Sequence, residues 1–124
     1  MKKNNKKFKK ELISKSLHLA KKLMRLVDKF PKKRSAWVIE DQLLGAGTSI
    51  GANIIESQAG VSKKDFVNFL SYALKSGNET KFWLTLSKEL NNKLIPEIDE
   101  CMCLTEELVK ILGSSVATIK GRRK

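Results

Sequence analysis

Basic side chains carry the clearest chemical signal in this sequence, because they concentrate at one end of the chain. Of 124 residues, 25 are Lys or Arg and 13 are Asp or Glu, which gives a net charge of +12. Residues 1–34 contain 14 basic and two acidic residues and hold the whole excess, because the 11 basic and 11 acidic residues that follow cancel. This asymmetry predicts binding to a polyanion, either a nucleic acid or an anionic membrane surface. A basic face that only aids solubility is the alternative.

Eleven of these basic residues are the candidates for contacts with nucleic-acid phosphates. They are Lys2, Lys3, Lys6, Lys7, Lys9, Lys10, Lys21, Lys22, Lys32, Lys33 and Arg34. Phosphate contacts are strong but carry no sequence information. Aromatic side chains for stacking on bases are scarce, since Phe66, Phe69 and Trp83 fall at predicted core positions. We therefore expect recognition of the shape or backbone of a nucleic acid, with a membrane-surface role for the same segment as an alternative.

Groups suited to catalysis or metal binding are few. The only histidine is His18, and no Glu-x-x-His pair of the kind used by di-metal helical bundles is present. A serine or cysteine nucleophile would need His18 beside it as a base, and no motif surrounds His18. Glu56 and Glu79 are predicted to be structural polar partners. We therefore predict a protein that is not an enzyme and that uses no metal and no cofactor.

The cysteines and the hydropathy pattern bear on location. Cys101 and Cys103 lie in an apolar helical pattern, which indicates reduced, buried thiols of a cytoplasmic protein rather than a disulfide framework. No apolar run has the length of a signal peptide or of a membrane span. We expect a cytoplasmic protein with no integral membrane association.

Four amphipathic segments must position these side chains. The helical period predicts helices over residues 8–29, 35–57, 62–92 and 96–119, with Ser35 and Ser62 as N-caps and Pro96 in the first turn of the last helix. Short connections and the absence of any alternating strand pattern predict an all-α fold, an antiparallel up-down four-helix bundle. We expect one domain spanning residues 1–124, with short basic disordered ends at about residues 1–5 and 120–124.

The second of these helices is the most informative, because it has two apolar faces. One face is typical of a bundle core, and the other predicts an oligomer interface formed by Trp37, Leu44, Gly51 and Ile55. A line of polar residues between the two faces is predicted to form a structural polar seam with the third helix. The seam consists of Gln42, Ser49, Asn53, Glu56, Glu79 and Thr80. Asn53 or Glu56 is expected to form a hydrogen bond with a group near Thr80, Glu79 or Lys75.

Glycines inside a helix lower its stability, so a packing reason is expected for them. Gly45, Gly47 and Gly51 lie in the middle of the second helix, where each costs about 0.5 to 1 kcal/mol relative to alanine. We predict that a neighbouring helix approaches the backbone closely at these positions.

Several motifs of the middle helices resemble a bacterial four-helix bundle family, which includes the protein encoded in intervening sequences of 23S ribosomal RNA and is also called S23 or IVP. The similar segments are Gln42-Leu43-Leu44, Gly47 to Asn53 with Glu56, Ser62 to Phe66, Glu79-Thr80 and Trp83-Leu84. The resemblance implies a homo-oligomer, typically a pentamer, that associates with RNA and has no known catalysis. Relatives include the accessory protein of diversity-generating retroelements, so the resemblance also implies a reverse transcriptase as an alternative partner.

Two positions depart from this family pattern. Related sequences commonly carry arginine at the position of Gly45, and arginine or another polar residue at the position of Ile55. If those arginines contact nucleic acid in relatives, the basic N-terminal region must supply that charge here. Two functions follow as hypotheses. The first is a homo-oligomeric RNA-binding protein, and the second is a protein-interaction scaffold or adaptor without direct nucleic-acid binding.

Overall fold

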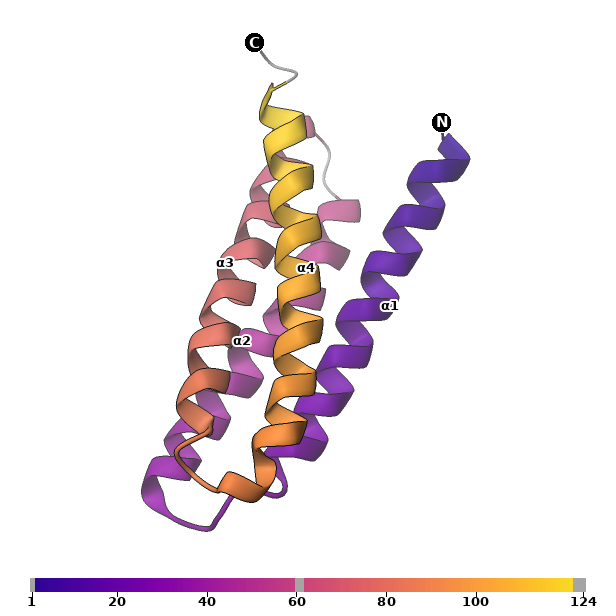
Figure 1. Ribbon diagram of the computed structural model, residues 1–124. Helices are drawn as coiled ribbons and strands as arrows, with labels where there is room; N and C mark the ends of the chain where they lie inside the picture. Colours follow the sequence, from indigo (N-terminus) through magenta and orange to yellow (C-terminus); the bar gives the residue numbers. More distant parts are fainter. Residues whose placement is uncertain (1, 60–61, 122–124) are drawn as a thin grey trace.

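Four long helices that run alternately up and down make up the protein (Figure 1). The computed structural model describes residues 2–59 and 62–121, with side chains described from residue 6 onward. The elements are α1 (Lys2–Val27), α2 (Arg34–Gln58), α3 (Lys63–Ser87), the short 3-10 helix η1 (Asn92–Leu94) and α4 (Ile95–Gly121). The described ranges contain no strand, which confirms the predicted all-α, antiparallel up-down four-helix bundle.

Local chemistry explains most of the helix boundaries. The Ser62 hydroxyl accepts a hydrogen bond from the Asp65 amide at 3.1 Å, which confirms Ser62 as the N-cap of α3. Pro96 lies in the first turn of α4, where its missing amide hydrogen leaves no helical bond unmade. The prediction of Ser35 as N-cap is wrong, because α2 begins at Arg34 after the extended residue Lys33, and no side chain caps it.

The chain ends are predicted to be disordered, but the residues of these ends that the structure describes are helical. α1 begins at Lys2 and α4 continues to Gly121, so residues 2–5 and 120–121 continue helices. The rest of that prediction, residues 1 and 122–124, lies outside the described residues.

The core is built from aliphatic side chains that recur every three or four residues on each helix. Fully buried members include Leu19 and Leu23 of α1, Leu43 of α2, Leu84 of α3 and Leu108 of α4. Each of these helices therefore turns one stripe toward a shared interior, as the helical period predicts. Consecutive helices are neighbours, and α4 closes the bundle against α1.

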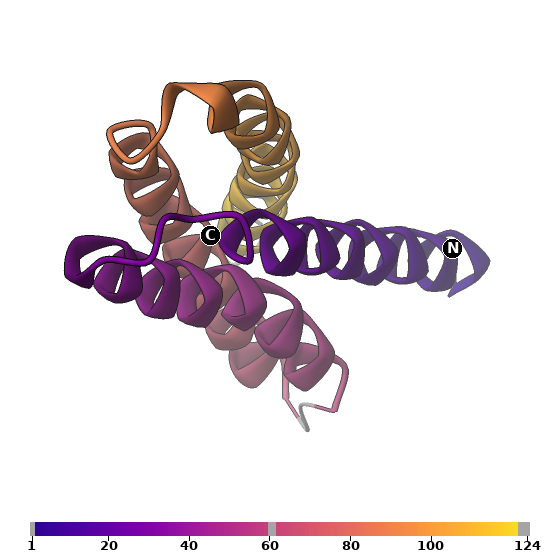
Figure 2. The same ribbon diagram turned by 90° about the horizontal axis from the view of Figure 1, so that it is seen from below.

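α1 does not follow α4 along its whole length. Figures 1 and 2 both show the N-terminal part of α1 diverging from the other helices, whereas its C-terminal part packs against them. The N-terminus of α1 lies at the same end of the bundle as the C-terminus of α4 and the start of α3. The basic N-terminal segment and the start of α3 are thereby brought to one end of the molecule.

Close helix packing accounts for Gly47 and Gly51 but not for Gly45. A Cβ atom on Gly47 would lie 2.2 Å from Cδ1 of the buried Leu23, and one on Gly51 would lie 2.9 Å from Oγ of Ser16, both on α1. A Cβ atom on Gly45 would meet nothing within 4 Å. The predicted close approach is therefore wrong for Gly45, because this residue is on the exposed side of α2.

These two environments predict opposite effects for the same substitution. Gly45→Ala is expected to stabilise the protein by about 0.5 to 1 kcal/mol, because alanine favours the helix. Gly47→Ala is expected to destabilise it, because forcing a methyl group against Leu23 costs about 1 to 3 kcal/mol and exceeds that gain. Urea unfolding of the two variants measures both values. Equal stabilisation by both would show that Leu23 moves aside freely.

Candidate nucleic-acid interface

Most of the predicted phosphate-binding side chains project from the outer surface of α1 and from the loop that follows it. Lys6, Lys7, Lys10 and Lys21 are exposed on α1, and Lys9 is partly buried there. The loop and the first residue of α2 add three exposed cations, which are Lys32, Lys33 and Arg34. The side chains of Lys2 and Lys3 lie outside the described part. None of the cations described here makes an ion pair with a described carboxylate, so no described acid neutralises their charges.

Lys22 does not belong to this free basic surface. Its ammonium donates a hydrogen bond to Glu100 of α4 at 2.7 Å, which raises the pKa of Lys22 and lowers the pKa of Glu100. Lys15 and Lys29, seven residues to either side, pair in the same way with Glu107 and Glu97. These three ion pairs connect α1 to α4, and because they are exposed to solvent each contributes little to stability. We therefore correct the candidate set by removing Lys22, whose charge is already matched within the chain.

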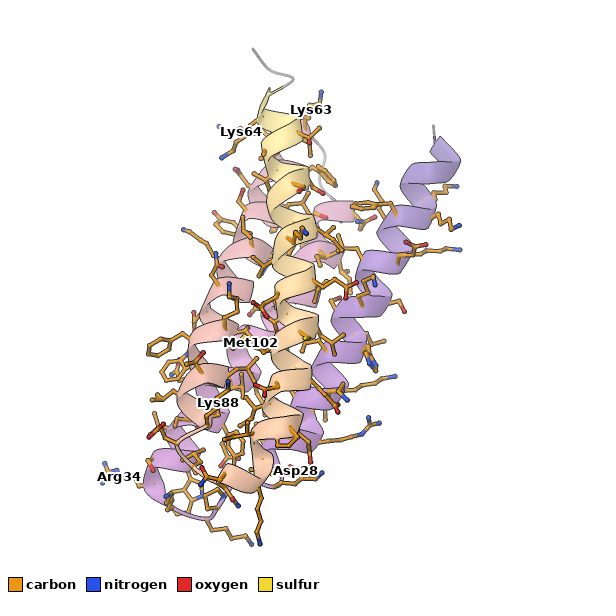
Figure 3. The ribbon with its side chains drawn as sticks, in the orientation of Figure 1. Asp28, Arg34, Lys63, Lys64, Lys88 and Met102 are labelled. Carbon is orange, nitrogen blue, oxygen red and sulfur yellow. The ribbon has the colours of Figure 1, made fainter. Side chains whose placement is uncertain are left out.

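The basic side chains divide between the two ends of the bundle. Figure 3 shows Lys63 and Lys64 at the end where α4 finishes, and Arg34 at the opposite end. The N-terminal lysines of α1 lie at the same end as Lys63 and Lys64. Sequence reasoning did not single out Lys63 or Lys64, because they are far from residues 1–34 in the chain and only the up-down topology brings them close.

The predicted polar seam is not enclosed within the bundle. Gln42, Glu56 and Glu79 are exposed, Ser49 and Asn53 are partly buried, and only Thr80 is fully buried. Asn53 donates from Nδ2 to the Ser49 carbonyl at 2.9 Å, and the Thr80 hydroxyl donates to the Ser76 carbonyl at 2.7 Å.

The expected hydrogen bond from Asn53 or Glu56 to the third helix is thus wrong for the described residues. Carbonyl groups one turn earlier in the same helix are the nearest acceptors and take the available donors. Glu79 also has a partner on its own helix, since it accepts from Nε1 of Trp83 at 3.0 Å.

Exposed apolar side chains of α1 and α2 form a second candidate surface, which we call the exposed apolar face. We define it by four residues that are each more than half exposed: Leu17 (53%), Met24 (57%), Trp37 (56%) and Ile55 (54%). Leu17 and Met24 directly follow Ser16 and Leu23, which contact α2 at Gly51 and Gly47. Ile55 is one turn beyond Gly51. By the helical period, Leu17 and Met24 lie on the side of α1 away from its ion pairs with α4, and Trp37 and Ile55 share one side of α2 next to Gly51.

This face only partly matches the predicted oligomer interface. Trp37 and Ile55 are exposed as that prediction requires, but Leu44 is half-buried against the core and Gly51 packs against Ser16 within the chain. Leu17 and Met24 recur at helical spacing with Ile13, Ala20 and Val27, so the sequence pattern predicts that they belong to the broad core stripe of the first helix. Their exposure shows that α1 buries a narrower stripe than the sequence suggests.

A cysteine and the histidine lie near one another, although no motif in the sequence predicts this. His18 and the exposed Cys103 line one hollow between α1 and α4, but no hydrogen bond joins them in the described structure. Cys101 is buried, as predicted, but the prediction of a buried thiol is wrong for Cys103, which is exposed because it lies on the outer side of α4. Across the described ranges, no three His, Cys, Asp or Glu residues gather as metal ligands, and no helix is long and apolar enough to cross a membrane.

Comparison with protein families settles the relationship that the motifs of α2 and α3 indicated. A model of the 23S rRNA-intervening sequence protein family matches residues 9–114. The chain belongs to this family. The match includes most of α1 and α4, so membership rests on all four helices as well as on the motifs of the two middle ones.

A solved structure supports this family fold. It is the crystal structure of a protein with unknown function from the S23 ribosomal protein family of Bacteroides thetaiotaomicron VPI-5482. The two chains are 32% identical, with a TM-score of 0.79, over 88% of this chain and 97% of the other. A search of curated proteins finds no match.

Proposed function

We propose that this family member is a non-enzymatic, homo-oligomeric RNA-binding protein that contacts RNA phosphates through the outer surface of α1. The observation that carries this proposal is the exposed row of lysines on α1, which makes no ion pair with any described carboxylate. Lys15, Lys22 and Lys29 on the same helix are paired with acids of α4. Only one group of lysines is thus neutralised within the chain, and the other group supplies the surface for a polyanion. The family name supports RNA as that polyanion.

The salt dependence of RNA binding tests this proposal. A variant with Lys6, Lys7 and Lys10 changed to glutamine is expected to bind structured RNA more weakly. The slope of log affinity against log salt should fall by about 2, because each lost phosphate contact removes roughly 0.7 to 0.9. The control changes Lys75, Lys93 and Lys110, which are exposed on other helices, and removes the same charge. Equal losses in both variants would show only a general effect of net charge and would contradict an α1 interface.

A protein-interaction scaffold is the second candidate, and the exposed apolar face of Leu17, Met24, Trp37 and Ile55 favours it. Monomeric proteins seldom leave such a face in water. We assign its partner as a second copy of this chain, and the pentamer implied by the family resemblance is the assembly we expect. Lys6, Lys7 and Lys10 precede Leu17 and Met24 along α1, so RNA binding at the N-terminal end of the helix is compatible with assembly farther along it. Lys21 lies between Leu17 and Met24 on the same side of α1.

A further inference from the structure

A cleft opens between the helices at the end of the bundle where α1 diverges from α4. Its volume is about 520 Å³, and all four helices contribute to its lining. The lining includes Phe8 and Lys9 of α1, Gln58 of α2, Lys63 and Phe66 of α3, and Thr118 of α4. A site of this size is within the range of small-ligand pockets, which is about 300 to 1,000 Å³.

Two phenylalanines give this cleft aromatic surface. Phe8 is 43% exposed. Phe66 is partly buried, and the ammonium of Lys9 lies 5.6 Å from the centroid of its ring. Aromatic rings beside a cation are the combination on which proteins stack the bases of single-stranded nucleic acids.

The polar groups of the cleft are suited to the edge of a base. Ser114 and Thr118 are exposed, and Gln58 donates to the Ile54 carbonyl only through a long contact of 3.4 Å. An acyl chain in this place would cover these hydroxyl and amide groups without pairing them, which carries a cost in free energy. A base presents donors and acceptors that could pair with them, so the polar lining favours a base over a lipid.

The charges of the cleft select an anion. Lys9 and Lys63 are the charged residues in its described lining, and no carboxylate is among them. Lys6 and Lys10 are exposed in the N-terminal part of α1, which lies at the same end of the bundle as the exposed Lys64 of α3. A strand that places one base in the cleft would therefore have its neighbouring phosphates beside lysines of both α1 and α3.

We propose that this cleft binds one unpaired base of a single-stranded RNA, with the base against Phe8 and Phe66 and the flanking phosphates at Lys9 and Lys63. The inference rests on the proposed RNA-binding function and narrows its partner to RNA with an accessible base. A base inside a regular duplex is already stacked and paired, so the cleft discriminates against duplex.

The test compares two RNAs of the same sequence, one single-stranded and one duplex. The single strand has about 12 nucleotides, which is within known site sizes, and carries one fluorescent 2-aminopurine. Binding of the single strand is expected to quench the 2-aminopurine, and its affinity should exceed that of the duplex. Phe8→Ala is expected to weaken single-strand binding by about tenfold and to abolish the quenching, while duplex binding stays unchanged. The control is Phe82→Ala, an exposed phenylalanine of α3 outside the cleft, which should change neither quantity.

A second variant keeps the proposal testable if Phe8→Ala fails to fold. Lys63→Gln is expected to lower the salt slope for the single strand by roughly 0.7 and to leave the duplex slope unchanged.

Three outcomes would contradict the proposal. The first is that both RNAs bind equally and that neither cleft variant has an effect. In that case the α1 interface still stands if the Lys6, Lys7 and Lys10 variant weakens binding. Failure of the intact protein to bind any RNA would overturn both. The protein could instead bind dodecanoate. If Phe8→Ala abolishes dodecanoate binding and leaves RNA affinity unchanged, the cleft is a site for an acyl anion and the proposal is overturned.

Discussion

Ile55→Glu is expected to convert an oligomer into a monomer of 14.0 kDa. Ile55 is 54% exposed in the single chain and belongs, with Leu17, Met24 and Trp37, to the exposed apolar face. If assembly removes about 400 Å² of apolar area per subunit, the hydrophobic contribution is roughly 10 kcal/mol, similar to the entropic cost of association. Assembly is then sensitive to one buried charge. A carboxylate in this interface costs about 3 kcal/mol or more, which is at least a hundredfold in the dissociation constant.

Light scattering behind size exclusion, across a dilution series, measures this change. The matched control is Val38→Glu. Val38 is 53% exposed on the same helix, but it lies about a quarter turn around α2 from Trp37 and Ile55. We expect the control to remain an oligomer. Dissociation by Val38→Glu with no effect of Ile55→Glu would place the interface on the α3 side of α2 and contradict the prediction. A monomeric parent protein at micromolar concentration would contradict assembly altogether.

Alkaline pH is expected to destabilise the protein through Cys101. Burial raises the pKa of this thiol from 9.0 to about 11. Below pH 9 the thiol is protonated in both folded and unfolded chains, so its contribution to stability is fully present. Between pH 9 and pH 11 the unfolded chain releases the proton while the folded chain retains it, so stability falls as pH rises. Since one pKa unit corresponds to about 1.4 kcal/mol, the loss approaches roughly 3 kcal/mol.

Urea unfolding at a series of pH values between 8 and about 11, a window set by the two pKa values, measures this loss. Lysine titration also weakens the ion pairs of Lys15 and Lys22 in this range, so the informative quantity is the difference between variants. Cys101→Ala should show a shallower decline than the parent, even though its stability at pH 8 is lower. Cys103→Ala removes an exposed thiol and should follow the parent curve. Parallel curves for the parent and Cys101→Ala would refute the assignment.

The sequence by itself determined the class of fold and most helix boundaries, because these depend on interactions between residues close in the chain. The Ser62 cap needs only Asp65 three residues later, and Pro96 acts through its own missing amide hydrogen. The helical period likewise identified the buried stripe of α2, including Leu43 and Ile50. Family membership was also predictable, since the motifs of α2 and α3 are continuous segments of sequence.

The tertiary structure alone decided which faces are covered and which charges are free. Periodicity places Leu17 and Met24 at the margin of the core stripe of α1. How much of that stripe a neighbouring helix buries depends on where the helices cross, and no local sequence pattern encodes the crossing. The same geometry neutralises Lys22 with Glu100, 78 residues away, and leaves Lys21 in solvent. The same geometry gives Gly45 and Gly47 different surroundings. Gly45 faces open space, whereas Gly47 lies against Leu23 of α1.

The cleft is the strongest case of a feature that exists only in three dimensions. Phe8, Lys63 and Thr118 belong to three different helices and share no motif. They meet because the up-down topology returns the chain to the same end of the bundle twice, and because α1 diverges from α4 at that end instead of closing the core.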